Sequence, residues 1–464
     1  MVRISGESLM AEHNRHMKTA QQLRLLSDAL DSGRLGPVRR LVNILSPAEI
    51  GNLLESLPAA KRNIVWGLVD PEDDGEVLVH VGDDVRESLL AEMDQDEIIA
   101  AVEDLDLDDL ADLIDDLPDT VIDEVLKSMD RDHRERLEQA LSYPEDSAGR
   151  LMNTDVVTVR ADVTIDVVLR YLRLRGELPE HTDYLSVVSR RNQYLGRISV
   201  SDLLTKDPVT PINELINDDQ PGIPLETPDN EVAKQFSDHD WISAPVVDAN
   251  NILLGRITID DVVDIIRGQA EHQALSAVGL DEDEDLFSPV PRAAKRRALW
   301  LGINLATAFL ASWVIGRFEA TLQQIVPLAI LMPIVASMGG VAATQTLTLM
   351  VRGIALGQVG VGNLKALFNK EALVGLINGL VWAVVVGIIS GFWFEPKIGL
   401  VIGCAMVINL IIAGMSGVIV PLLLKRMDID PALAGGVVVT TVTDVMGFLV
   451  FLGLGTWILI GVPA

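Results

Sequence analysis

Sustained runs of apolar residues occur only in the last third of the chain. Five of them follow residue 297, and each is long enough for a helix to cross the roughly 30 Å hydrocarbon core of a bilayer. The five runs are Ala298–Ile315, Ile325–Met350, Ala372–Phe394, Gly399–Leu424 and Leu433–Val462. The pattern therefore predicts a multidomain membrane protein whose residues 298–464 form an α-helical membrane domain with five transmembrane helices.

The chain from residue 1 to residue 142 shows a different pattern, in which single apolar positions recur at helical spacing. Leu41 and Leu45 lie four positions apart, and Leu53 and Leu57 repeat that spacing. Prolines interrupt the pattern at Pro58, Pro71 and Pro118. Short amphipathic helices separated by turns predict an acidic, all-α superhelical N domain over residues 1–142.

An internal duplication follows the helical region. The segment YLGRISVSD at 194–202 resembles LLGRITIDD at 253–261, and the offset is constant, since Gly196 matches Gly255 and Asp202 matches Asp261. A Val-Val pair precedes each copy as a short buried strand. Strand, turn, strand and helix repeated twice resemble a tandem CBS pair. We therefore predict two α/β units, over 143–208 and 209–268, followed by a connecting (plug) helix over 269–297.

Each copy of the duplication contains a hydroxyl residue followed by an aspartate three positions later. The two pairs are Ser199 with Asp202, and Thr258 with Asp261. They match the ribose-binding motif of CBS pairs, so the resemblance implies that ATP or another adenine nucleotide binds. The same spacing also suits a helix N-cap, and the sequence leaves both roles open.

Charge divides the chain at the same place as hydropathy. The net charge is −30, whereas the segment from Arg292 onward holds 11 Lys and Arg against 6 Asp and Glu, which leaves about −35 on the residues before it. Such a surface repels nucleic acid and favours cations. There is no nucleophile–base pair, phosphate-binding loop or metal-hydrolase spacing, so we expect no enzyme.

Basic residues determine the predicted orientation in the membrane. Nine lie before the first apolar run or in the second and fourth connections, against Arg317 and Lys397 in the other two. Basic connections stay on the cytoplasmic side, and no signal peptide opens the chain. We predict a multi-pass protein of the cell inner (plasma) membrane with a cytoplasmic N-terminus and the C-terminus outside.

One ionisable residue lies deep within an apolar run. Asp444 is about twelve positions into the fifth run, and no Lys, Arg or His of the runs can neutralise it. Its partner is either a cation from solution or a hydroxyl of Thr440 or Thr441. Pro333 frees a carbonyl in the second run, and the pairs Gly339-Gly340 and Gly435-Gly436 allow close backbone approach.

Magnesium suits this composition best. Mg²⁺ keeps several of its waters and takes few carboxylates, and the lack of soft ligands disfavours copper or zinc. Two copies on a twofold axis would place two Asp444 carboxylates around one hydrated ion.

The order of these parts resembles the MgtE family of magnesium channels over nearly the whole chain. The stretches that carry the resemblance are 143–152 (YPEDSAGRLM), 332–345, 430–433 (DPAL) and 440–447 (TTVTDVMG). The resemblance implies a homodimer in the lipid bilayer, with a pore on the twofold axis between the second and fifth helices. It also implies a pore ion site made by Asp444, Thr440, Gly436 and Gly340.

The same resemblance implies a cytosolic Mg²⁺ sensor that gates the channel. Asp108 and Asp112 of the N domain would share Mg²⁺ with acids of the second CBS unit and lock the connecting helices over the pore. Those acids are Asp240, Asp261 and Asp264. The function implied is a Mg²⁺-selective channel for magnesium uptake.

The sequence departs from the family pattern at two places, and it leaves two other functions open. Val341 replaces an Asn that often follows the paired glycines, and Arg267, Gln269 and His272 stand where acids are common, which predicts weaker closure by cytosolic Mg²⁺. Asp444 could alternatively carry protons in an H⁺-coupled Mg²⁺/Co²⁺ secondary transporter, or the chain could be a membrane Mg²⁺ sensor that transports nothing.

Overall fold

The computed structural model of the chain describes residues 26–103, 105–114, 116–117, 119–129, 131–276, 278–280, 285–360, 362–427 and 429–461. The chain divides into two compact units. One comprises Met1–Gln269 with Asp283–Ser288, and the other comprises Ala270–Glu282 with Pro289–Ala464. The start of the predicted N domain, positions 1–25, and the predicted end of the last run at Val462 lie outside the described residues.

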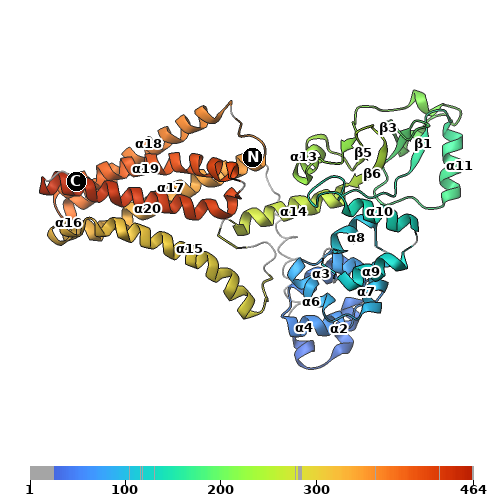
Figure 1. Cartoon of the computed structure of the whole chain (residues 1–464), viewed down its shortest axis with the longest axis horizontal. Helices are drawn as coiled ribbons and strands as arrows, with labels where there is room; N and C mark the ends of the chain where they lie inside the picture. Colours follow the sequence, from blue (N-terminus) through green and yellow to red (C-terminus); the bar gives the residue numbers. More distant parts are fainter. Residues whose placement is uncertain are drawn as a thin grey trace, which may run out of the picture. The chain divides into compact units, whose positions relative to one another are not determined.

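The first unit contains a stack of short helices around one continuous hydrophobic core (Figure 1). The labelled helices are α2 (Leu35–Val42), α3 (Pro47–Glu55), α4 (Ala59–Trp66), α5 (Asp74–Val79), α6 (Asp83–Leu90), α7 (Gln95–Glu103), α8 (Leu107–Ile114), α9 (Asp119–Ser128) and α10 (Arg131–Leu141). Apolar residues recur at helical spacing because each helix turns one face to this core. The prediction of an all-α N domain is confirmed.

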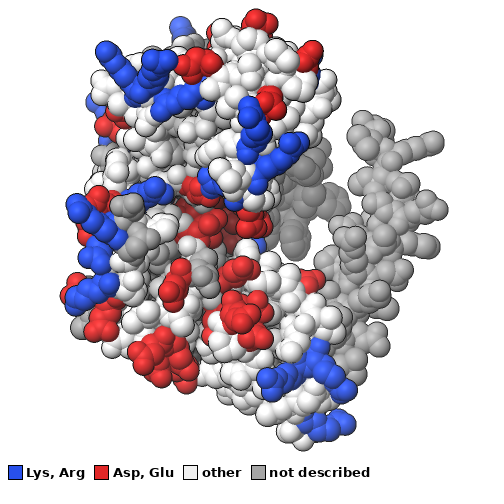
Figure 2. Space-filling model, turned by 90° about the vertical axis from the view of Figure 1, so that its right-hand side faces the viewer, with Lys and Arg blue, Asp and Glu red and all other residues white. Residues whose placement is uncertain are grey.

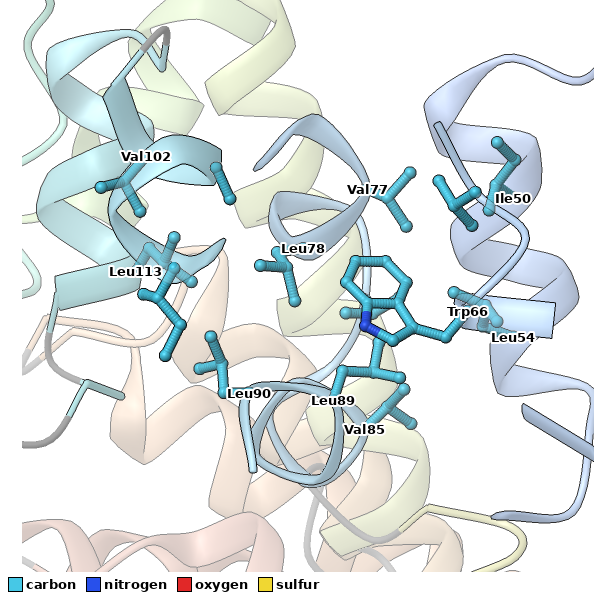
Figure 3. Close-up of a cluster of buried hydrophobic side chains, with 14 of the residues drawn as sticks. Ile50, Leu54, Trp66, Val77, Leu78, Val85, Leu89, Leu90, Val102 and Leu113 are labelled. Atoms are coloured by element: carbon cyan, nitrogen blue, oxygen red, sulfur yellow. The ribbon is translucent and has the colours of Figure 1, made fainter. Parts of the chain in front are cut away.

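Trp66 lies near the middle of this core. Leu54, Leu78 and Leu89 surround its indole ring in Figure 3, and all three are fully buried. Arg62 is also buried, and its guanidinium donates to the carbonyl oxygens of Leu54 and Leu57 and contacts Asp285 Oδ2 at 2.7 Å. The buried charge is therefore paired, as burial of a cation requires.

Two small sheets follow in the same unit, and their topologies are identical. Their strands are β1 (Thr158–Arg160), β2 (Tyr184–Val188) and β3 (Tyr194–Ser199), then β4 (Ile223–Pro224), β5 (Ser243–Val247) and β6 (Leu253–Thr258). In each sheet the first two strands are parallel and the last two antiparallel. Val187 pairs with Gly196 as Val246 pairs with Gly255, so the duplicated sequence adopts a duplicated register. The prediction of two duplicated α/β units is confirmed.

Helices accompany the two sheets. They are α11 (Ile165–Arg175), α12 (Val200–Thr205), α13 (Asp229–His239) and α14 (Ile259–Ser276), with a 3₁₀ turn at Ile212–Glu214. α14 begins directly after β6 and continues without interruption to Ser276. The boundary that the sequence suggested at 268/269 therefore falls inside one helix.

The second unit contains five helices that are long and apolar enough to cross a membrane, counted over the described residues. They are α15 (Val290–Gly316), α17 (Val326–Ala355), α18 (Leu364–Trp393), α19 (Pro396–Arg426) and α20 (Pro431–Gly455), the last continued by a π-helical turn at Thr456–Ile460. A short helix, α16 (Glu319–Gln324), precedes α17. The predicted five-helix domain is confirmed.

α19 is the most buried of these helices and packs against α17, α18 and α20. Glycines allow its close contact with α18. A Cβ added to Gly375 would lie 2.5 Å from the carbonyl oxygen of Leu410, and one added to Gly379 would lie 2.9 Å from Cα of Val407. Small residues at these positions let the two backbones touch.

Candidate functional site

α20 carries three of the predicted pore residues on one face. Gly436, Thr440 and Asp444 are spaced four positions apart, so they follow one another at successive turns. The Thr440 hydroxyl donates to the Gly436 carbonyl, and Asp444 is half-buried. Asp430 begins the helix as its N-cap and accepts from the amide of Ala432 at 2.8 Å.

The fourth predicted pore residue, Gly340 of α17, lies opposite this face of α20. A Cβ added to Gly340 would meet Cγ2 of Thr440 at 3.5 Å, which is ordinary contact. The structure therefore brings Gly340 and Thr440 together from helices that are far apart in the sequence.

The hydroxyls that could have bonded Asp444 donate elsewhere. Thr441 donates to the carbonyl oxygen of Val437 at 2.6 Å, and Thr440 donates to Gly436. Within the described part of the chain, the Asp444 carboxylate has no hydrogen-bond or ion-pair partner. This arrangement favours water or a cation as the partner of Asp444.

The apolar pattern did not predict the role of Asn409 on α19. This residue is fully buried, and its Nδ2 donates to the carbonyl oxygen of Val335 on α17 at 2.9 Å. A Cβ added to Gly339 or Gly447 would come within 2.5 or 3.0 Å of the Asn409 amide group. The two glycines therefore make room for a polar side chain between α17 and α20. The sequence feature that could have indicated this role is the presence of an Asn within the fourth apolar run.

Glu371 is a second acid of the membrane unit. The sequence placed it just before the third run, but α18 begins at Leu364 and includes it. Glu371 is buried, accepts from the Thr346 hydroxyl of α17 at 3.0 Å and pairs with Lys370 at 3.1 Å. These contacts give it a structural role in joining α17 to α18.

In the first unit, acids of α8 face acids at the start of α14. Asp108 interacts electrostatically with Asp261, and Asp109 with Asp260 and Asp264. Figure 2 shows Asp and Glu side chains gathered in the middle of the face that it presents. We define the acid cluster as Asp106, Asp108, Asp109 and Asp112 of the N domain with Asp260, Asp261 and Asp264 of α14.

The acid cluster is electrostatically unfavourable when fully ionised. Burial, followed by neighbouring carboxylates, raises the pKa of Asp109 to about 7 and that of Asp261 to about 7. Burial raises the pKa of Asp108 well above its usual range, and Asp261 contributes further. A cation in the cluster would relieve this repulsion.

Four of the five predicted sensor acids belong to the cluster, and Asp240 does not. Asp240 ends α13 in the left-handed conformation, with φ 54°, and it is not among the described acids that interact with Asp108, Asp109 or Asp261. Asp106, Asp109 and Asp260 were not predicted. Asp109 and Asp260 could have been found, because each directly adjoins a named acid in an Asp-Asp pair.

The cluster fits a hydrated ion better than a dehydrated one. Among the described residues, no group of three or more His, Cys, Asp or Glu side chains is close enough to hold a metal ion directly. Mg²⁺ typically keeps several waters and uses one or two carboxylates. The separation of the acids is therefore compatible with Mg²⁺ held largely through its water shell.

We predict that Mg²⁺ binding to the first unit releases protons near pH 7. The raised pKa values of Asp109 and Asp261 mean that protonation stabilises the contact between the N domain and the second CBS unit. This contribution to stability is present at about pH 4 and is lost as the pH rises through about 7. Cation binding requires the ionised carboxylates, so affinity should be weaker at pH 6 than at pH 8. Calorimetry in buffers of different ionisation enthalpy measures the released protons. The same release at pH 6.5 and pH 9 would contradict the prediction.

His272, a departure from the family pattern, has a defined contact in the second unit. Its Nε2 lies 2.9 Å from Oδ2 of Asp430, the N-cap of α20. The other carboxylate oxygen of Asp430 accepts from Ala432. The end of α14 is thus attached to the start of the helix that carries Asp444.

Both Ser/Thr-x-x-Asp motifs act as helix caps. The amide of Asp202 donates to Ser199 Oγ at 2.9 Å, and the amide of Thr258 donates to Asp261 Oδ2 at 3.2 Å. Asp261 also belongs to the acid cluster, so the second motif faces α8. The capping role is therefore present, whatever else these residues do.

A narrow cleft lies within the CBS pair, with a volume of about 20 Å³. Tyr194, Arg197, Gln220 and Arg256 line it, and each has one buried polar atom with no hydrogen-bond partner in the described part of the chain. Buried polar atoms are usually satisfied. This cleft therefore has unused hydrogen-bonding capacity.

Three kinds of family model match this chain. A divalent cation transporter model, MgtE, matches residues 332–454, and the MgtE intracellular N domain matches 45–146. The CBS domain matches 148–208 and 212–268.

Two curated relatives extend over nearly the whole chain. The magnesium transporter MgtE of Thermus thermophilus is 30% identical over 441 residues, covering 94% of this chain and 98% of the relative. The magnesium transporter MgtE of Bacillus subtilis is 27% identical over 430 residues, covering 92% and 95%. Such transport is not an enzymatic function.

Solved structures are also similar to part of the chain. The cytosolic domain of the Mg²⁺ channel MgtE in complex with ATP is 30% identical, with a TM-score of 0.47, covering 52% of this chain and 98% of that chain. The soluble part of a magnesium transporter is 25% identical, with a TM-score of 0.46, covering 54% and 99%.

Proposed function

Because the chain belongs to the MgtE family of magnesium transporters, we propose that it is a Mg²⁺-selective channel for magnesium uptake, gated by cytosolic Mg²⁺ at the acid cluster. The observation that carries the proposal is the face of α20 on which Gly436, Thr440 and Asp444 follow one another, with Gly340 beside Thr440. These groups offer one carboxylate and one hydroxyl oxygen, because the Thr440 proton is donated to the Gly436 carbonyl. Such oxygen ligands suit a partly hydrated Mg²⁺.

The proposed pore requires two copies of the chain. One Asp444 supplies a single carboxylate, whereas a twofold axis beside α20 would supply two at the same level. Several large apolar side chains of the membrane unit are exposed, among them Leu299, Phe309 and Trp313 of α15. Lipid or a second copy would cover them, and we propose a homodimer in the inner membrane with a cytoplasmic N-terminus.

The acid cluster supports the proposed gate. Ionised Asp108, Asp109 and Asp261 repel one another across the boundary between the N domain and the second CBS unit. When bound there, Mg²⁺ would supply the positive charge that stabilises the contact. Since α14 begins in the cluster and runs on to Ser276, its acids are the first residues of the connecting helix. Loss of Mg²⁺ would free that helix.

Ion flux into liposomes that contain the purified full-length protein tests the proposal. We expect Mg²⁺ influx driven by its own gradient at equal pH on both sides, with no pH change inside. Co-transport of protons in a fixed ratio would instead identify an H⁺-coupled transporter. An absence of flux for Mg²⁺, Co²⁺ and Mn²⁺ would leave the non-transporting sensor.

We further propose that the CBS pair binds ATP or another adenine nucleotide. The unused hydrogen-bonding capacity of the cleft supports this, because Arg197 and Arg256 suit a phosphate and Gln220 and Tyr194 suit a base or ribose. The cleft of about 20 Å³ must widen to admit a nucleotide. Equilibrium dialysis with ATP tests binding, and the Arg197→Gln variant should weaken it.

A further inference from the structure

Arg256 of β6 lies where the CBS pair meets the N domain. Its amide and carbonyl exchange hydrogen bonds with the backbone of Asn153 at 2.9 and 2.8 Å. The Asn153 side chain in turn donates to Asp108 Oδ1 at 3.4 Å. The guanidinium donates to the carbonyl of Glu180 at 2.6 Å and to Thr182 Oγ1 at 3.4 Å. Backbone pairing therefore holds Arg256 beside α8.

The charge of Arg256 acts on several carboxylates at once. It interacts with Asp155 and with three members of the acid cluster, Asp106, Asp108 and Asp260. Other cations are nearby but engage different acids. Arg175 binds Asp155 through both carboxylate oxygens at 2.7 and 2.9 Å, and Arg150 lies 4.0 Å from Asp112. Among the arginines whose partners the structure describes, Arg256 is the one that interacts with acids of both α8 and α14.

We propose that Arg256 is a built-in counter-ion of the acid cluster, which keeps the N domain on the CBS pair when no divalent cation is bound. The inference rests on the proposed sensor. Ionised acids without a cation repel one another, and a nearby guanidinium offsets part of that repulsion. Once a divalent cation neutralises the acid cluster, little negative charge remains in the cluster for Arg256 to offset. It therefore stabilises the ion-free contact selectively.

The internal duplication supplies a matched control. Arg197 occupies the position of Arg256 in the first copy of the duplication, and it pairs with Ser186 as Arg256 pairs with Pro245. Its guanidinium instead lies 3.9 Å from the ring centroid of Tyr184. Replacing Arg197 therefore removes the same charge from an equivalent strand without touching the acid cluster.

Limited proteolysis of the full-length protein at residues 130–150 tests this role, in chelator and in millimolar Mg²⁺. We expect Arg256→Gln to be cleaved roughly five-fold faster than wild type in chelator, as loss of one partly buried charge interaction implies, and equally fast in Mg²⁺. In these nucleotide-free solutions, Arg256→Lys should be cleaved at the wild-type rate, and so should Arg197→Gln, whose proposed contact with a nucleotide is then not in play. About 1 M KCl should reduce the excess, because it screens repulsion beyond about 3 Å.

The outcomes separate the counter-ion from the sensor. No excess in chelator, or an excess that KCl does not reduce, would overturn the role of Arg256, because a purely structural arginine is insensitive to salt. Equal cleavage of wild type in chelator and Mg²⁺ would refute the sensor instead. A salt-sensitive excess for Arg256→Gln in that case would still support the counter-ion.

Discussion

Replacing Asp444 by Asn is expected to reduce Mg²⁺ flux by at least about ten-fold while the protein remains folded and keeps the oligomeric state of the wild type. The substitution preserves shape and removes the charge that attracts the ion. Hydrogen bonds to a charged group contribute about 1.5–3 kcal/mol, and a loss of about 1.4 kcal/mol corresponds to ten-fold. Mg²⁺ influx into liposomes at matched protein density measures the effect.

A matched variant controls for the loss of a negative charge. Glu395 is exposed immediately before α19, so Glu395→Gln removes one charge away from the face of α20 that carries Asp444. We expect its flux to equal that of wild type. Flux of Asp444→Asn near the wild-type value, with the Glu395→Gln control also unchanged, would refute the pore assignment.

The architecture could be predicted because each part of the chain has its own pattern of apolar residues or its own repeat. Runs of apolar residues predicted the five membrane helices, and the internal duplication predicted two sheets with equivalent register. Helical spacing predicted a stack around a shared core. These signals are local, so they require no knowledge of which element packs on which.

Contacts between elements could not be predicted in the same way. The Asn409 side chain fits between α17 and α20 because Gly339 and Gly447 on those helices leave room for it. Nothing in the sequence indicates that these three residues meet. Glu371 lies outside the predicted third run, which starts at Ala372, because the helix begins earlier than the apolar run. Hydropathy identifies where a chain leaves the lipid, and a helix often continues past that point.

The acid cluster shows both the value and the limit of resemblance. Asp108, Asp112, Asp261 and Asp264 were chosen by resemblance, and the fold brings them to one place. Asp240 was chosen on the same basis, yet it ends α13 elsewhere. Arg256 had no motif to mark it, because an arginine becomes a counter-ion only through the acids that the fold places around it.

Chelation of Mg²⁺ is expected to accelerate proteolysis between residues 130 and 150 of the wild-type protein several-fold. Without the cation, the ionised acids of the N domain and of α14 repel one another, and the contact between the N domain and the second CBS unit opens. Residues 130–150 lie between these two parts in the sequence, and their proteolysis rate follows the fraction of molecules in which the contact is open. The double variant Asp109→Asn with Asp261→Asn removes two of the repelling charges. It should be cleaved slowly in chelator and in Mg²⁺ alike, because it no longer needs the cation.

The Asp240→Asn variant distinguishes geometry from resemblance in the same experiment. If the cluster defined by the fold is the sensor, Asp240→Asn should retain the full difference between chelator and Mg²⁺, since Asp240 lies outside the cluster. A loss of that difference in Asp240→Asn, with the double variant still responding, would move the sensor away from α8 and α14. A difference that persists in both variants would show that repulsion among these acids does not drive the opening.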